Sequence, residues 1–218
     1  MRSDLPKLLD RSDQLAAALR QLTYCELLPT TLREALAFGQ ARHCMELSDA
    51  QRLLLRAELD ASAMSLVRVQ FESTTRALWL SSAATDHQLQ RYTSPTPSSE
   101  LKSAHQGPSV DDMLKAMGDG PASHISAVLR VLKEATWRAM NHYSHASLIA
   151  VAQANHQPRD PYQLAGALLN ANGMLMIAAN VSMMSSRHLS TAVLRAVQEE
   201  FANCLPLTSG TAHTQAAT

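Results

Sequence analysis

The 218-residue sequence is poor in aromatic residues, which make up 4% of it, and has only seven glycines and three cysteines. So little glycine, with so much Ala, Leu, Met and Arg, favours helix over sheet. The three cysteines lie far apart and form no metal-binding motif, and their odd number fits a reducing cytoplasm. The formal net charge is zero, so no overall charge attracts nucleic acid or an anionic membrane. The N-terminal residues lack the apolar segment of a secretion signal. We therefore expect a cytoplasmic, all-α protein.

Helix-start signals predict three helices in the first half of the chain. Asp4, two residues before a proline, is a typical helix start, and this helix ends before residue 29. Thr30 or Thr31 caps a second helix that we expect to end near residue 47. Ser48 and Gln51 have the spacing of a capping box, in which the two residues cap a helix start reciprocally. This box predicts a long third helix from residue 49 to about residue 84.

The second half begins with residues 93–108, whose prolines and serines predict an exposed loop. Helix start and stop signals after this loop predict helices at about residues 109–118, 122–155, 161–186 and 190–204. Neither half has enough complete helices to fold alone. The sequence thus predicts one domain at residues 1–205, an up-and-down bundle of about six helices, and a disordered tail at residues 206–218.

Formal charges are missing from a long stretch of the second half. Between Arg138 and Arg187 the only charged residues are Arg159 and Asp160, both in an expected turn. A membrane hairpin would need about 20 largely apolar residues in each arm. The asparagines and histidines in these arms argue against insertion, so we expect no membrane contact. Instead, these helices are predicted to form the centre of the bundle or to be partly covered in a homodimer.

Two stripes of polar residues are the candidates for function. In the first, residues spaced four, four and three apart share one helical face: Arg68, Glu72, Arg76 and Trp79. In the second, four residues fall within an arc of about 100° on the helix surface: Arg138, Asn141, His142 and His145. We predict that the two stripes face each other between neighbouring helices.

The first stripe has two interpretations. The simpler one is an ion pair of Glu72 with Arg68 or Arg76 on the surface, which stabilises a helix by a few tenths of a kcal/mol. The alternative is an inward-facing Arg–Glu–Arg cluster. Two arginines against one glutamate leave a positive charge that calls for an anionic ligand or a protein partner. In this interpretation Trp79 and Tyr143 join the ligand-binding residues.

The second stripe could carry acid–base chemistry. Too few carboxylates accompany His142 and His145 for a helical di-metal site, so we predict neither a metal nor another cofactor. The sequence contains no nucleophile elbow, so we do not predict a Ser-His-Asp hydrolase. Asn141 and His145 could be hydrogen-bonded core residues with no further role. Alternatively, Arg138 and His145 lie about 10 Å apart along a helix, where an arginine could neutralise a phosphate and a histidine could move a proton.

Six residues separate Arg138 from His145. This spacing resembles the arginine-to-histidine motif of HEPN-type helical proteins, which occur in toxin–antitoxin and antiphage systems. The stretch from Phe71 to Leu80 and the residues Asn141–His145 are also similar to related bacterial helical proteins. The resemblance implies a dimeric α-bundle and, in active members, metal-independent RNA cleavage, with an antitoxin-like protein as a further partner. It assigns phosphate binding to Arg138 and general acid–base catalysis to His145. A non-enzymatic binding module and a purely structural bundle remain the alternatives.

Overall fold

The computed structural model describes residues 4–24, 29–93, 107–145, 151, 160–185 and 191–206, and over these ranges the chain is helical with no strand. The all-α prediction is therefore confirmed. Where the sequence predicted about six helices, the described ranges contain eight α-helices and one 3₁₀ helix: α1 (Leu5–Thr23), α2 (Leu32–Arg56), α3 (Asp60–Ser82), α4 (Asp86–Gln90), α6 (Val110–Ala116), α7 (Ser123–Ser144), α9 (Pro161–Ser185), α10 (Thr191–Glu200) and η2 (Ala202–Cys204). The predicted loop falls largely, and the predicted tail almost entirely, outside these ranges.

Several predicted helix starts are confirmed by their capping hydrogen bonds. The Asp4 side chain accepts the backbone N–H of Lys7 at the start of α1. Ser109 forms the predicted capping box at the start of α6. Asp160 Oδ1 accepts the backbone N–H of Tyr162 at 2.9 Å as α9 begins. At α2 the cap is Thr31, one of the two threonines expected there.

The predicted helix start at Ser48 is wrong, because α2 continues through it and ends eight residues later. Glu58 adopts a left-handed conformation, with φ of 58°, and this ends α2. The backbone N–H groups of Glu58 and Leu59 donate to the carbonyls of Leu55 and Leu54, at 3.2 and 2.9 Å. This is the hydrogen-bond pattern of a Schellman motif, which usually has glycine at the left-handed position. Because glutamate stands there instead of glycine, the residue type does not mark the end of α2.

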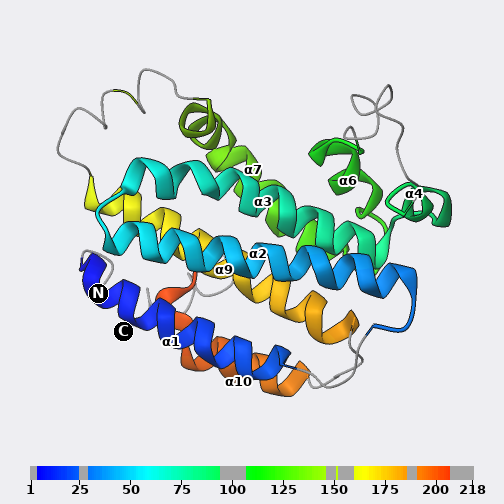
Figure 1. Ribbon diagram of the computed structural model, residues 1–218, viewed down its shortest axis with the longest axis horizontal. Helices are drawn as coiled ribbons and strands as arrows, with labels where there is room; N and C mark the ends of the chain where they lie inside the picture. The colour runs from blue at the N-terminus through cyan, green and yellow to red at the C-terminus, as the bar shows by residue number, and fades with distance from the viewer. Residues whose placement is uncertain are drawn as a thin grey trace, which may run out of the picture.

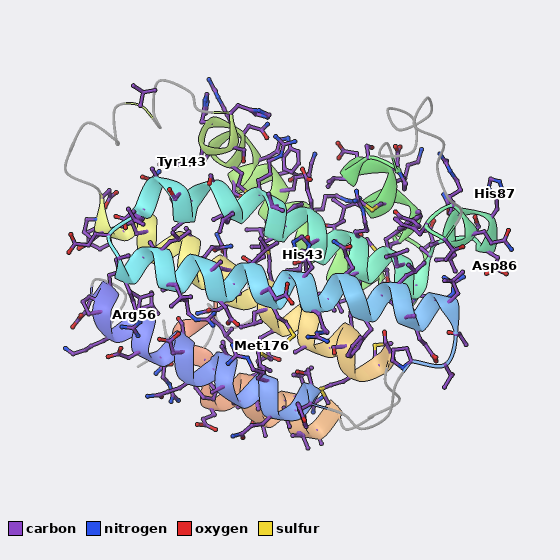
Figure 2. All side chains as sticks on the ribbon, in the orientation of Figure 1. His43, Arg56, Asp86, His87, Tyr143 and Met176 are labelled. Carbon is purple, nitrogen blue, oxygen red and sulfur yellow. The ribbon has the colours of Figure 1, made fainter. Side chains whose placement is uncertain are left out.

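Ser48 serves instead as a partner for a buried arginine in the helix interior. Arg52, whose side chain is only 4% exposed, donates to Ser48 Oγ at 2.8 Å and to Asp13 of α1 at 2.7 Å. It also pairs with Asp49 one turn away. Arg56, which faces α1 at one end of α2 (Figure 2), pairs with Asp13 at 2.6 Å. These ion pairs fix α1 against α2.

Helix α9 is the centre of the fold, as predicted for a helix without charges. It packs against α1, α2 and α3, and in the view of Figure 1 α3 lies above it and α1 below it. Its polar groups have partners on several elements: Asn172 Nδ2 donates to Ser12 Oγ and to the carbonyl of Cys204, both at 2.8 Å, and the carbonyl of Ala171 accepts from Gln70 at 3.1 Å. All eight α-helices contribute to one cluster of buried apolar side chains.

Helix α9 is also, among the described residues, the one helix long and apolar enough to cross a membrane by length and composition. Of its most apolar stretch, 67% is buried against the rest of the protein. A core helix of this kind needs no charged face, because other helices surround it.

Candidate functional site

Helix α7 lies along α3, so the two helices that carry the polar stripes are neighbours (Figure 1). The hydroxyl of Ser144 near the end of α7 donates to the carbonyl of Ser65 near the start of α3, at 3.4 Å. Further along, the ring of Trp137 meets that of Phe71 edge to face, with centroids 6.0 Å apart. The helices therefore run antiparallel. The predicted juxtaposition of the two stripes is confirmed at this end.

Arg68 is the residue that joins the two helices. Its Nε donates to Glu72 Oε1 at 2.9 Å, and its Nη1 lies 2.7 Å from Nε2 of His145. An arginine can only donate, so His145 accepts at Nε2 and carries its proton on Nδ1. The guanidinium also lies over the ring of Trp137, 5.0 Å from its centroid. We call these four residues the Arg68 cluster.

Trp137 contacts a second cation, which the sequence analysis did not identify. The ammonium group of Lys133 lies 5.1 Å from the centroid of its ring and forms an ion pair with Asp111 of α6 at 2.8 Å. Cations are attracted to the negative face of an aromatic ring. Lys133 lies one turn of helix before Trp137, so this spacing is the signal that could have found it.

Two buried polar atoms near the Arg68 cluster have no hydrogen-bond partner among the described residues: Nε of Arg76 and Oδ1 of Asn141. Arg76 is half-buried one turn after Glu72, and in the described part of the chain no carboxylate pairs with it. The nearest carboxylate in its stripe, that of Glu72, is bonded to Arg68. A buried donor without a partner costs free energy, and a buried charged one costs more.

The remaining predicted residues take different positions. Arg138 is exposed, and no hydrogen bond or ion pair within the described residues joins it to His145. Since α7 ends at Ser144, His145 lies just beyond the helix instead of in its interior. Trp79 is 1% exposed in the core and so has no access to a ligand from solvent. The structure thus places Arg68, and not Arg138, beside His145.

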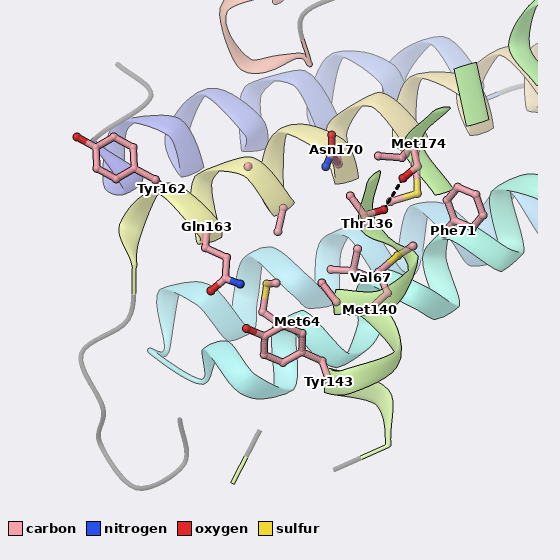
Figure 3. A pocket seen from close by; sticks show the side chains of 14 residues that line it. Met64, Val67, Phe71, Thr136, Met140, Tyr143, Tyr162, Gln163, Asn170 and Met174 are labelled. Atoms are coloured by element: carbon pink, nitrogen blue, oxygen red, sulfur yellow. Dashed lines mark hydrogen bonds between the residues drawn. The ribbon is translucent and has the colours of Figure 1, made fainter. Parts of the chain in front are cut away.

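His142 and Tyr143 follow the Arg68 cluster along α7. His142 is half-buried, and Tyr143 is buried and lines a pocket between α3, α7 and α9 (Figure 3). This pocket has a volume of about 220 Å³ and largely apolar walls. Tyr143 therefore belongs to a cavity and not to the polar edge. Within the described ranges no three His, Cys, Asp or Glu side chains are grouped as metal ligands would be.

Comparison with known proteins adds one finding to this geometry. The model of a family described as a family of unknown function, DUF6988, matches residues 41–207, which is more than half of the chain. The chain belongs to the DUF6988 family. No curated protein and no solved structure matches it.

The region shared with DUF6988 holds all the residues of the candidate site described above. It includes all of α3, α7 and α9, and therefore both the Arg68 cluster and the pocket. Helix α1 and the first turns of α2 lie outside the match. The family description names no activity.

Proposed function

We propose that this DUF6988 protein binds an anionic ligand, with a phosphate or carboxylate group, beside the Arg68 cluster. The observation that carries the proposal is Arg76, a half-buried guanidinium whose buried Nε has no partner among the described residues. A planar guanidinium suits a phosphate or a carboxylate, because its N–H groups can donate to two oxygens at once. An anion bound there would satisfy Arg76 Nε.

The charges around this edge favour an anion over a cation. Glu72 forms an ion pair with Arg68, and Asp111 forms one with Lys133. Arg76 is the cation in this group that has no carboxylate partner within the described residues. A spare positive charge in a half-buried position is stabilised by an anion more than it would be in open water.

The test is a thermal-shift titration with inorganic phosphate and with a nucleoside monophosphate. We expect both to raise the melting temperature of the wild type, because a ligand that binds only the folded state stabilises it. Arg76→Met keeps an apolar stem but removes the guanidinium, and it should abolish the rise. Arg42→Met is the matched control: Arg42 is an exposed arginine of α2, and this variant should respond as the wild type does. A flat response of the wild type, or an unchanged response of Arg76→Met, would refute the proposal.

The hydrogen bond between Arg68 and His145 favours a second candidate. We propose as this second candidate a metal-independent RNase of the HEPN-like kind, acting as a cytoplasmic homodimer and paired with an antitoxin-like protein. His145 is exposed and would move the proton that it carries on Nδ1, and the adjacent guanidinium of Arg68 would neutralise the phosphate. The resemblance assigns phosphate binding to Arg138, which would contribute a second positive charge from the exposed side of α7. Asn141 and His142 lie within the same turn.

Cleavage of structured RNA in the presence of EDTA tests the second candidate. We expect His145→Ala and Arg68→Ala to remove the activity, and Arg138→Ala to show whether the motif arginine contributes. Cleavage that persists in His145→Ala would come from a contaminant or from another site. If RNA stays intact and no anion binds, the Arg68 cluster has only a structural role, as in the third alternative.

A further inference from the structure

The pocket between α3, α7 and α9 is separate from the anion site proposed above. Its walls come from three helices, and its main apolar residues are Met64, Val67 and Phe71 of α3, Met140 of α7 and Met174 of α9. Thr136 also lines it, but its hydroxyl is bonded to the carbonyl of Leu132 at 2.6 Å. The pocket is thus a preformed cavity with walls that water solvates poorly.

The size of the pocket sets the size of its ligand. An engineered cavity of about 150 Å³ with apolar walls stays dry and binds benzene. At about 220 Å³ this pocket holds a somewhat larger molecule. By the same scale, its occupant has about nine non-hydrogen atoms, which is fewer than a typical drug-sized ligand has.

The wall chemistry sets the class of ligand. None of the residues that line the pocket carries a formal charge, so a charged ligand would lose its hydration without gaining an ion pair. Three methionines and three aromatic residues line the cavity, and sulfur–aromatic contacts are favourable. These walls therefore suit a neutral aromatic ring.

Two side-chain amides add a polar element. Asn170 and Gln163 of α9 line the pocket, and Figure 3 shows Gln163 extending from α9 toward Met64 and Tyr143. Within the described residues neither amide has a side-chain hydrogen bond, so both can bond to a ligand. A small number of polar groups on apolar walls is what orients a ligand in a binding site.

From this geometry we infer that the pocket binds a neutral aromatic molecule of about nine non-hydrogen atoms, with one hydrogen-bonding group that reaches the amide of Asn170 or Gln163. This inference is independent of the anion site, which uses the charged groups of α3 and α7. Indole is a suitable probe, because it has the required size, a flat apolar ring and a single N–H donor. Indole-3-carboxylate has the same ring with a negative charge and is the matched negative probe.

Gly166 of α9 gives a direct way to fill the pocket. A Cβ at this position would meet no heavy atom within 4 Å, so a larger side chain enters open space. Gly39 in α2 has equally open surroundings but does not line the pocket. Gly166→Leu and Gly39→Leu are therefore matched variants: both replace a helical glycine at which a Cβ meets nothing within 4 Å, and only the first lies in the wall of the cavity.

The experiment titrates the full-length chain with indole and follows backbone amide signals by NMR. With indole, we expect shifts at the lining residues in the wild type and in Gly39→Leu. Gly166→Leu should bind indole at least tenfold more weakly than the wild type does. The wild type should bind indole-3-carboxylate at least tenfold more weakly than indole. Equal binding of indole by Gly166→Leu, shifts confined to residues outside the pocket, or no shifts up to the solubility limit would each overturn the inference. The melting temperature of Gly166→Leu shows that it is folded, so a loss of binding cannot come from unfolding.

Discussion

The hydrogen bond from Arg68 to His145 makes a quantitative prediction about how α3 and α7 are held together. We consider Arg68→Met, His145→Ala and the double variant as a double-mutant cycle, which isolates the energy of interaction between the two side chains. The nitrogen–nitrogen distance of 2.7 Å and the charged donor indicate a strong hydrogen bond.

Partial exposure reduces its contribution. The Arg68 side chain is 25% exposed, and His145 is at the surface, so water competes for both groups. We therefore expect a coupling energy of about 1 kcal/mol, below the range for fully buried charged hydrogen bonds. Arg68→Met alone should cost more than this, because it also leaves Glu72 without its partner and removes the cation from the Trp137 ring.

Urea unfolding of the four proteins measures the coupling. With a slope of about 2.5 kcal/mol/M, 1 kcal/mol corresponds to a shift of about 0.4 M in the unfolding midpoint. A second cycle, with Arg42→Met in place of Arg68→Met, should give additive effects, because Arg42 lies on α2 and has no interaction with His145. If the first cycle is also additive to within about 0.3 kcal/mol, the end of α7 does not lie against α3 in solution, and the proposed RNase site loses its geometric basis.

Three further predictions concern stability. Arg52→Ala should lower the free energy of unfolding by about 3 kcal/mol, because the buried guanidinium has partners on two helices, whereas Arg56→Ala, at 41% exposure, should cost less than about 1 kcal/mol. Gly173→Ala should destabilise the protein by about 1 to 2 kcal/mol, because its Cβ would lie 2.9 Å from the ring of Pro206. Gly166→Ala should stabilise it by about 1 kcal/mol, because its Cβ meets nothing within 4 Å and alanine favours a helix more than glycine does. Hydrogen bonds from the Thr30 backbone and hydroxyl hold the pKa of Glu34 at about 2, below its ordinary 4.5. The stability that Glu34 contributes is therefore complete above pH 4.5 and is lost as the pH falls toward 2. The wild type should therefore lose its advantage over Glu34→Gln across that interval.

Denaturant unfolding checks the first two predictions, and the same measurement repeated across pH checks the third. Equal costs for the two arginine variants would mean that burial of Arg52 adds nothing to its ion pairs. Equal effects at the two glycines would contradict the different surroundings that they have on α9. A stability difference between wild type and Glu34→Gln that stays constant from pH 5 to pH 2 would show that Glu34 is not held by its hydrogen bonds.

The fold was predictable where local chemistry determines it. Asp4, Ser109 and Asp160 cap helices because each side chain bonds to a backbone N–H only a few residues away, and such spacings are visible in the sequence. The end of α2 was not predictable in this way. A left-handed conformation is disfavoured for glutamate by its own side chain, and here it accompanies the two backbone hydrogen bonds of the Schellman motif. Because the helix end at Glu58 was not expected, the capping-box pattern at Ser48 predicted the wrong boundary between the second and third helices.

The candidate site was predictable in part. Helical spacing gives the angular position of a side chain, so the side of α3 that carries Arg68 and Glu72 was correctly expected to face α7, although His145 lies just beyond the end of that helix. The spacing does not tell which arginine extends toward a neighbouring helix, and this is why Arg68 and not Arg138 lies beside His145. Nor does it distinguish an aromatic ring in the core, such as Trp79, from one at the edge, such as Trp137. Those differences depend on contacts between residues that are far apart in sequence.

The late position of α9 in the chain has a consequence for synthesis in the cell. Helices α1, α2 and α3 leave the ribosome first, and their apolar faces are complementary to a segment that has not yet been made. Until residue 185 has been translated, these faces have no native partner in α9, and exposed apolar surface of this kind promotes aggregation. The nascent chain would therefore benefit from a chaperone until α9 can insert between its neighbours.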